Sequence, residues 1–262
     1  MILFACLLLF IALSYFLASV AIKPVKETWE GQKRFIADAS HDMKTPLTVI
    51  LANTDIIKSQ SGSGEWEKWL DSTRSEAERM RRLVDSMLEL SSTEVSDERI
   101  VLSEISLSEI SERTVLQMEA VAFEKSVLIE SNIKKNVIIK GNEDRLTRLL
   151  HILIDNGIKY AKGGSVLRVS LAKGKRFARL SVTNEGSYVN EDDLPRLFER
   201  FYRGDKARSG GGFGLGLSIA KNLTESMGGS ITAENKEGVG ATFTASFPIS
   251  EKLLTKIFYQ RR

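Results

Sequence analysis

The stretch FIADASHDMKTPLTVI, from Phe35 to Ile50, combines a helical repeat with a histidine and a proline. The positions expected to face a neighbouring helix, which we call the seam, recur at alternating steps of four and three residues. They continue past this stretch: Ile36, Ser40, Met43, Leu47, Ile50, Thr54 and Ile57. Such a repeat is typical of one helix packed along another. Pro46 removes the helical hydrogen bond to the carbonyl of Asp42, and His41 falls one step outside the seam. We therefore expect a bent helix that carries a histidine on its solvent side.

A second helix is expected after SQSGSG, residues 59–64, which breaks the first one. Its seam repeats with the same spacing: Trp66, Leu70, Thr73, Ala77, Met80, Val84 and Met87. Two helices alone cannot enclose a seam of this length, so we expect an antiparallel helical hairpin that dimerises into a four-helix bundle. Packing of the hairpin against the rest of the same chain is the alternative.

Upstream of the hairpin, residues 1–22 contain no charged side chain. At about 1.5 Å per residue they can cross a hydrocarbon core of about 30 Å, so we predict a single membrane-spanning helix at the cell membrane. A cleaved signal peptide is the alternative, but no basic region precedes the apolar run, which is longer than a signal peptide needs. Basic residues follow the run from Lys23 onward, so the remainder of the chain is expected to be cytoplasmic.

Charge and cysteine content exclude some classes of protein. The 37 basic and 34 acidic residues give a net charge of +3, too balanced to indicate nucleic-acid binding. Cys6 is the single cysteine, so the chain has no internal disulfide and no cysteine-based metal site.

Beyond a polar stretch at Ser91–Asp97, expected to be a linker, the pattern changes to short β-type runs alternating with helices. Strands are expected near residues 127–131, 137–141, 166–172, 178–183, 230–233 and 242–247, and helices near 107–124, 143–160 and 215–227. This mixture predicts an α/β layered domain of about 150 residues. The fold class is therefore a multi-domain α+β protein with four parts: residues 1–22, 23–92, 93–250 and a basic tail at 251–262.

A glycine-rich stretch, SGGGFGLGLSIAKNLTESMGG at residues 209–229, leads into an apolar helix. Backbone N–H groups at the start of a helix suit phosphate oxygens, although a flexible surface loop explains the same pattern. The stretch lacks the lysine of a P-loop, and the charged residues before it argue against a dinucleotide fingerprint.

The stretch LLHILIDNGIKYA, residues 149–161, reads as an amphipathic helix with polar residues away from its apolar stripe. The amide oxygen of Asn156 suits Mg²⁺, and Lys159, about one turn later, can pair with phosphate. An ordinary amphipathic helix with a polar back is the alternative.

His41 is a candidate nucleophile because a neutral imidazole, with an unperturbed pKa of about 6.5, is available near neutral pH. The neighbouring carboxylate of Asp42 can hydrogen-bond the other ring nitrogen and accept its proton. A surface histidine without a role is the alternative.

Together these segments resemble the sensor histidine kinases of bacterial two-component systems, over residues 26–248. SHDMKTPL resembles the phosphoacceptor box, DNGIKYA the N box, NEG a variant adenine-site box, LFERFYR the F box and GFGLGL the ATP-lid box. GVGATF is similar to the family's last nucleotide-site segment. The boxes occur in the family's order and spacing, which makes the joint signal strong.

The resemblance implies an ATP-dependent protein-histidine kinase with a histidine-kinase-type α/β-sandwich domain. His41 would be phosphorylated by ATP with Asp42 as base. A separate hypothesis is that Thr45, one turn beyond His41, orients a water for dephosphorylation of the partner. That partner would be a response regulator, phosphorylated on an aspartate, and the hairpin would form a homodimer. Asn156 would bind Mg²⁺. The nucleotide site implied by the resemblance comprises Asn156, Lys159, Tyr160, Asn184, Gly186, Gly212, Gly214, Leu215, Gly216 and Thr242.

Three positions depart from the family pattern. Ile152 stands where the N box has an earlier asparagine, Asn184 replaces the adenine-site aspartate, and Tyr188 replaces a glycine. These changes leave open a phosphatase-biased or degenerate member, and an ATP-binding scaffold is a further alternative. Because charged hydrogen bonds are stronger than neutral ones, we expect Asn184→Asp to bind ATP at most about tenfold more tightly. The signal is expected to arrive within the membrane, through a partner, or through residues upstream of Met1.

Overall fold

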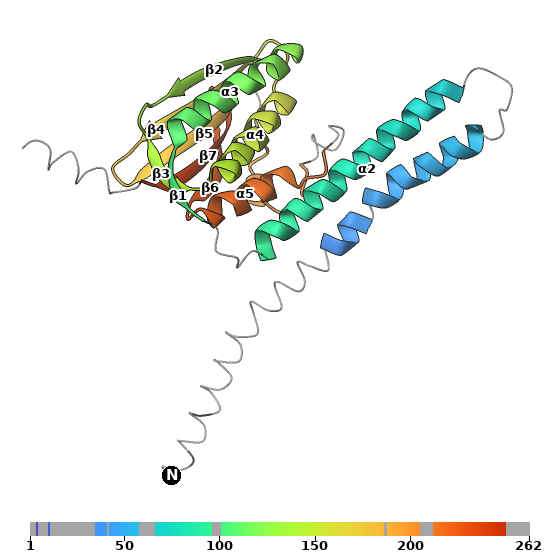
Figure 1. Cartoon of the computed structure of the whole chain (residues 1–262), viewed down its shortest axis with the longest axis horizontal. Helices are drawn as coiled ribbons and strands as arrows, with labels where there is room; N and C mark the ends of the chain where they lie inside the picture. The colour runs from blue at the N-terminus through green and yellow to red at the C-terminus, as the bar shows by residue number, and fades with distance from the viewer. Residues whose placement is uncertain are drawn as a thin grey trace, which may run out of the picture. The chain divides into compact units, whose positions relative to one another are not determined.

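The computed structural model describes Phe4, Phe10 and residues 35–40, 42–57, 66–95, 101–185, 188–204 and 212–249. The chain divides into two compact units, Met1–Arg82 and Leu83–Arg262. The boundary between the units falls inside helix α2, Trp66–Val95. Figure 1 traces the elements along the chain.

Several sequence predictions fall on residues outside the described ranges. They include His41, Gly186, the basic tail at 251–262 and the predicted membrane helix, of which only Phe4 and Phe10 are described. Within the described ranges, none of the helices combines the length and the apolar character needed to cross a bilayer.

The first unit contains helical segments at residues 35–40 and 42–57, followed by the start of α2. The helix at 42–57 runs through Pro46, and Asn53 donates its side-chain N–H to the Ser72 hydroxyl at 3.0 Å, which links the two helices. Helix α2 continues to Val95, so most of the predicted linker at Ser91–Asp97 is helical. The polar composition there gave no apolar periodicity from which a helix could be predicted.

The burial pattern of the hairpin differs from the predicted seam. On the first helix, Ala39, Pro46 and Asn53 are buried. Several large apolar side chains, some of them seam positions, instead remain exposed, and they form what we call the outer stripe: Ile36, Leu47, Leu51, Trp66, Leu70, Val84 and Leu88. Periodicity revealed that each helix has apolar positions, but it does not say which of two adjacent stripes is covered within one chain.

The second unit is a layered α/β domain, as predicted. Its elements are β1 (Ser103–Ser106), α3 (Leu107–Glu124), β2 (Leu128–Ile133), β3 (Ile138–Gly141), α4 (Glu143–Tyr160), β4 (Val166–Lys173), β5 (Phe177–Glu185), a 3-10 turn (Leu194–Arg196), α5 (Gly216–Ser226), β6 (Ser230–Lys236) and β7 (Gly240–Pro248). Five strands form a sheet in the order β2-β4-β5-β7-β6, in which β2 and β4 pair in parallel and the other pairs are antiparallel. Strands β1 and β3 form a separate antiparallel pair. Helices α3, α4 and α5 lie on one face of the five-stranded sheet (Figure 1).

The core lies between this sheet and its helices. Alternate residues of the central strands, such as Leu167 and Val169 in β4 and Leu180 and Val182 in β5, are fully buried. They pack on the side that α4 covers, and burial of each such side chain stabilises the fold by about 1.5–3 kcal/mol. Asn184 continues the same row of β5, so it is the polar side chain at the end of an otherwise apolar row.

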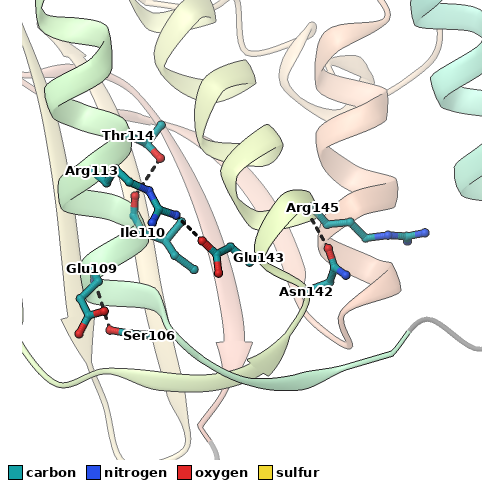
Figure 2. Close-up of polar contacts among 8 residues, drawn as sticks. All are labelled: Ser106, Glu109, Ile110, Arg113, Thr114, Asn142, Glu143 and Arg145. Carbon is teal, nitrogen blue, oxygen red and sulfur yellow. Dashed lines mark hydrogen bonds and ion pairs between the residues drawn. The ribbon is translucent and has the colours of Figure 1, made fainter.

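The starts of α3 and α4 are defined by side-chain caps (Figure 2). Ser106 accepts a hydrogen bond from the backbone N–H of Glu109 at 3.3 Å, and Asn142 accepts one from the N–H of Arg145 at 3.1 Å. An ion pair of 2.5 Å between Arg113 and Glu143 joins the two helices. The caps set where α4 begins and therefore which residues lie on its last turns, where the candidate site is found.

Candidate functional site

Asn184 joins the sheet to helix α4. Its side-chain N–H donates to the backbone carbonyl of Gly157 at 2.9 Å, and the side chain is 2% exposed. A carbonyl oxygen can only accept, so the amide has one orientation that satisfies this contact. The Asn184 Oδ1 atom is then a buried acceptor without a hydrogen-bond partner among the described residues. Because an unpaired buried acceptor costs about 1–3 kcal/mol, this atom marks a position for a donor group of a ligand.

Gly157 is required at this position by the close approach of strand and helix. A Cβ atom at position 157 would lie 2.5 Å from Leu167 Cδ1 and 3.1 Å from Asn184 Oδ1. Any larger residue would therefore push α4 away from the sheet and close the space beside the free oxygen.

Lys159 provides a cationic group near the C-terminal end of α4. A Cβ at position 212 would lie 2.5 Å from Lys159 Nζ, so the ammonium lies against the backbone of Gly212. Burial lowers the pKa of Lys159, the charge of Arg203 lowers it further, and Asp155 opposes the shift. Two like charges beside a glycine backbone form a site that an anion would stabilise.

Tyr160 completes this end of the helix. Lys159 Nζ lies 5.2 Å from the centroid of the Tyr160 ring. Burial raises the pKa of Tyr160, although the charge of Arg203 acts in the opposite direction. The hydroxyl therefore stays neutral at physiological pH and can donate a hydrogen bond.

Gly214 and Gly216 differ in how strongly their surroundings require a glycine. Gly214 is in the left-handed region, with φ of 70°, and a Cβ there would lie 2.6 Å from the carbonyl carbon of Phe201 and 2.7 Å from the Tyr202 oxygen. A Cβ at position 216 would lie 3.5 Å from Ile152 Cγ2, an ordinary packing distance. Gly214 thus holds the start of α5 against the backbone of the preceding segment.

Among the predicted nucleotide-site residues, the structure places Lys159 against Gly212 and Asn184 against Gly157, whereas Thr242 has a different partner. The Thr242 hydroxyl pairs with Thr183 at 3.0 Å. Thr183 and Asn184 are neighbours in β5 and so point to opposite faces of the sheet, and the residue paired with Asn184 in β7 is Ala241. Thr242 therefore lies on the face opposite the free oxygen of Asn184.

Leu215 and Asn156 are two further predicted site residues whose positions the structure describes. Leu215 is buried, 2% exposed, and its carbonyl accepts a hydrogen bond from the Ser218 hydroxyl at 2.8 Å. Asn156 is half-buried and directly precedes Gly157 in α4. The described residues contain no group of three or more His, Cys, Asp or Glu side chains that could hold a metal ion.

Sequence reasoning missed Gly157 and Arg203 as site residues. Both lie inside the motifs DNGIKYA and LFERFYR. The motifs were recognised, but these two residues within them were not assigned a role. The charge of Arg203 acts on Lys159 and Tyr160, which lie far from it in sequence. Only the fold places this arginine next to α4.

The candidate phosphoacceptor segment belongs to the first unit. Asp42 is half-buried, Thr45 is exposed and Pro46 is buried. Asp42 and Thr45 are three residues apart on one helix and share a face. The hydroxyls of Ser40 and Thr48 each donate to the carbonyl four residues earlier, at 2.7 and 2.8 Å.

Comparison with known proteins yields matches for both parts. The family model described as "His Kinase A (phospho-acceptor) domain" matches residues 32–95, and the one described as "Histidine kinase-, DNA gyrase B-, and HSP90-like ATPase" matches residues 141–251. Sensor histidine kinase YcbM of Bacillus subtilis is 31% identical over 223 residues, which cover 83% of this chain and 72% of that protein. Sensor histidine kinase YkoH of the same organism is 35% identical over 227 residues, covering 85% of this chain and 49% of that protein.

A solved structure shares the fold. The histidine kinase ThkA in complex with response regulator protein TrrA superposes with a TM-score of 0.71 and 21% identity, covering 87% of this chain and 65% of that chain. A hairpin of the phosphoacceptor type followed by an ATPase domain defines the class. This chain belongs to the sensor histidine kinases of two-component systems, which confirms the resemblance seen in the sequence. It spans about half the length of the first curated relatives that it matches.

Proposed function

We propose that this chain is an ATP-dependent protein-histidine kinase that phosphorylates itself on His41 and passes the phosphoryl group to an aspartate of a response regulator. The observation that carries the proposal is the unpartnered, buried Oδ1 of Asn184 in the same domain as the cationic group formed by Lys159 and Arg203. Together they offer an acceptor for a base and positive charge for phosphates.

The free oxygen of Asn184 suits adenine. The exocyclic amino group of adenine donates, so it would pair with Oδ1. Guanine has a carbonyl oxygen at the corresponding ring position, and two acceptors would then face each other. A site with a buried polar group rejects a ligand that leaves this group unpaired, which favours ATP over GTP.

The phosphates would lie near Lys159, Arg203 and the backbone of Gly212. Phosphate oxygens would offset the repulsion between the two cations and so restore the lowered pKa of Lys159. Asn156 offers an amide oxygen for Mg²⁺, an ion usually held by one or two protein oxygens together with substrate phosphates. When bound, Mg²⁺ would neutralise the charge that develops on the phosphates.

The proposed reaction transfers the γ-phosphoryl group to a ring nitrogen of His41. The nitrogen–phosphorus bond forms as the bond between the γ-phosphorus and the β,γ-bridging oxygen breaks, and ADP leaves. Asp42 accepts the proton from the other ring nitrogen. We further propose that Thr45, exposed on the same helix, orients a water that hydrolyses the partner's phosphoaspartate.

Two features support a homodimer and a partner surface on the hairpin. The outer stripe exposes large apolar side chains, including Leu51 at 57% and Leu88 at 64% exposure, and a second copy of the hairpin would cover them. ThkA was solved with a response regulator, which supports a response regulator as the phosphoryl acceptor here.

We also propose that residues 1–22 anchor the chain in the cell membrane as a single span, with both kinase domains in the cytoplasm. The support is the uncharged run followed by basic residues.

The test uses the full chain incubated with Mg²⁺ and ATP labelled on the γ-phosphate. A phosphohistidine is acid-labile and alkali-stable, so we expect label with these properties in the wild type and none in His41→Gln. His151→Gln is the matched control, because His151 is the second of the two histidines and should leave the label intact. If the label survives in His41→Gln and disappears in His151→Gln, the acceptor is His151 and the proposal for His41 is wrong.

A further inference from the structure

Tyr202 is held by two neighbours in the segment before the glycine stretch. Its hydroxyl donates a hydrogen bond to Asp193 Oδ1, and the guanidinium carbon of Arg196 lies 4.2 Å from the centroid of its ring. Arg196 in turn lies 3.4 Å from a carboxylate oxygen of Glu199. We call Asp193, Arg196 and Tyr202 the tyrosine cluster. It restrains both the hydroxyl and the face of one ring.

The backbone next to this cluster has an unusual conformation. Phe201 is in the left-handed region, with φ of 59°, which a bulky residue adopts only when its surroundings enforce it. The backbone atoms of Phe201 and Tyr202 form the surface against which Gly214 packs. The tyrosine cluster therefore supports the backbone surface, which we call the seat of Gly214, against which Gly214 packs at the start of α5.

The cluster also adjoins the residue after Arg203. A Cβ at position 204 would lie 2.6 Å from Asp193 Oδ2, so the same carboxylate that accepts from Tyr202 lies over the backbone of Gly204. Arg203 is thus flanked by two residues in contact with Asp193. Its charge acts on Lys159 and Tyr160 in α4, on the phosphate side of the candidate site.

We propose that Asp193, Arg196 and Tyr202 are positioning residues for the polyphosphate of ATP. They act by holding Arg203 beside Lys159 and by fixing the seat of Gly214, without touching the nucleotide. Ordering these groups before the ligand arrives lowers the entropy lost on binding. This inference rests on the proposed function, because it assumes that the anion at Lys159 and Arg203 is the nucleotide's phosphate chain.

The decisive comparison is between ATP and AMP. Tyr202→Phe keeps the ring and its contact with Arg196 but removes the hydrogen bond to Asp193. In the full chain, we expect calorimetry to show ATP affinity reduced by roughly tenfold, the scale of one hydrogen bond to a charged group. AMP has the same base but lacks the β- and γ-phosphates, so its affinity should change less than twofold, roughly the reproducibility of such comparisons.

Three further variants test the Asp193 carboxylate as the connection between Tyr202 and the segment around Arg203. Asp193→Asn keeps an acceptor but removes its charge, so it should weaken ATP binding in the same direction. The double variant Tyr202→Phe/Asp193→Asn should lose little more than the weaker-binding single variant, since both changes weaken the same interaction. Gly204→Ala should produce a similar loss, because the added Cβ displaces the Asp193 carboxylate. Glu143→Gln is the control: it breaks the ion pair with Arg113 on another part of the domain and should leave ATP affinity unchanged.

An equal loss of ATP and AMP affinity in Tyr202→Phe would show that the cluster supports the domain in general, and would overturn the inference. Unchanged ATP affinity in Tyr202→Phe and in Asp193→Asn would overturn it as well. A wild-type protein that binds neither ATP nor AMP would instead overturn the proposed function, and the inference with it.

Discussion

Asn184 donates its side-chain N–H to the carbonyl oxygen of Gly157 at 2.9 Å and thereby joins strand β5 to helix α4. The contact leaves the amide oxygen, Oδ1, without a partner among the described residues and therefore available to a ligand. An aspartate in place of Asn184 could not form this contact while ionised, because a carboxylate has no donor. The asparagine is therefore a structural connection as well as a recognition group.

We expect Asn184→Asp to bind ATP no more tightly than the wild type, in contrast to the gain expected from the sequence alone. The substitution removes one hydrogen bond and turns a negative oxygen toward the Gly157 carbonyl, at a cost of about 1–3 kcal/mol of stability. Thermal unfolding and ATP calorimetry on the same samples measure both effects.

The matched control for this substitution is Asn142→Asp. Asn142 uses only its side-chain oxygen, as an acceptor from the N–H of Arg145, and aspartate caps helices equally well. It should therefore keep the wild-type stability. Tighter ATP binding in Asn184→Asp without loss of stability would contradict the amide orientation described above.

ATP affinity should depend on pH through Lys159. Its pKa is lowered from the ordinary value of 10.5 in the free protein, and nearby phosphates would raise it again. Binding then takes up a proton, so affinity should fall as the pH rises through the lowered pKa and level off above the pKa of the complex. Calorimetry in buffers of different ionisation enthalpy measures the proton uptake.

Lys159→Arg serves as the comparison, because arginine remains charged throughout this range. Its ATP affinity should lack the alkaline decrease, whatever its absolute value. A wild-type affinity that is constant through alkaline pH would contradict the placement of phosphate beside Lys159.

Gly214→Ala should abolish ATP binding or reduce it strongly. The left-handed backbone costs alanine about 1–2 kcal/mol, and the Cβ would collide with the backbone of Phe201 and Tyr202. Gly228→Ala is matched for the backbone cost, since Gly228 has φ of 72° but no heavy atom within 4 Å of an added Cβ. It should lower the melting temperature while ATP affinity stays the same. Equal ATP affinity in the two variants would show that the collision has no effect on the site.

Leu51→Glu should convert the protein from a dimer into a monomer. Leu51 belongs to the outer stripe and is 57% exposed in the single chain, so a charge there should spare the fold of the hairpin but oppose burial against a second copy. Sedimentation of the full chain in detergent reports the mass, and circular dichroism reports the helix content. Ala52→Glu, at the neighbouring exposed position, is the control and should remain dimeric. A dimeric Leu51→Glu protein would place the dimer interface elsewhere.

Periodicity in the sequence located the long elements well. Helices α3 and α4 occupy the predicted residues, because each combines an apolar stripe with a capping residue at its start. Strand β1, with the sequence SEIS, was missed because four residues of mixed polarity show no alternation. It exists because β3 pairs with it.

The candidate site was predicted in part. The boxes around Asn156, Lys159 and Gly212 were recognised from their order along the chain, and the structure places Lys159 against Gly212. Thr242 was included because it lies in a glycine-containing box, yet strand register turns its side chain to the other face of the sheet. Register depends on pairing between distant strands, so a local motif does not reveal it.

The sequence by itself determined the family, the two-part organisation of hairpin and α/β domain, and the residue types available for chemistry, because periodicity and box order are local properties of the chain. Tertiary structure decided which of these residues meet. The donation from Asn184 to Gly157, the charge of Arg203 beside Lys159 and the contact of Asp193 with Tyr202 each depend on how separate segments pack. Hydrogen bonds and electrostatic interactions act over a few ångströms of space, whatever the separation along the chain.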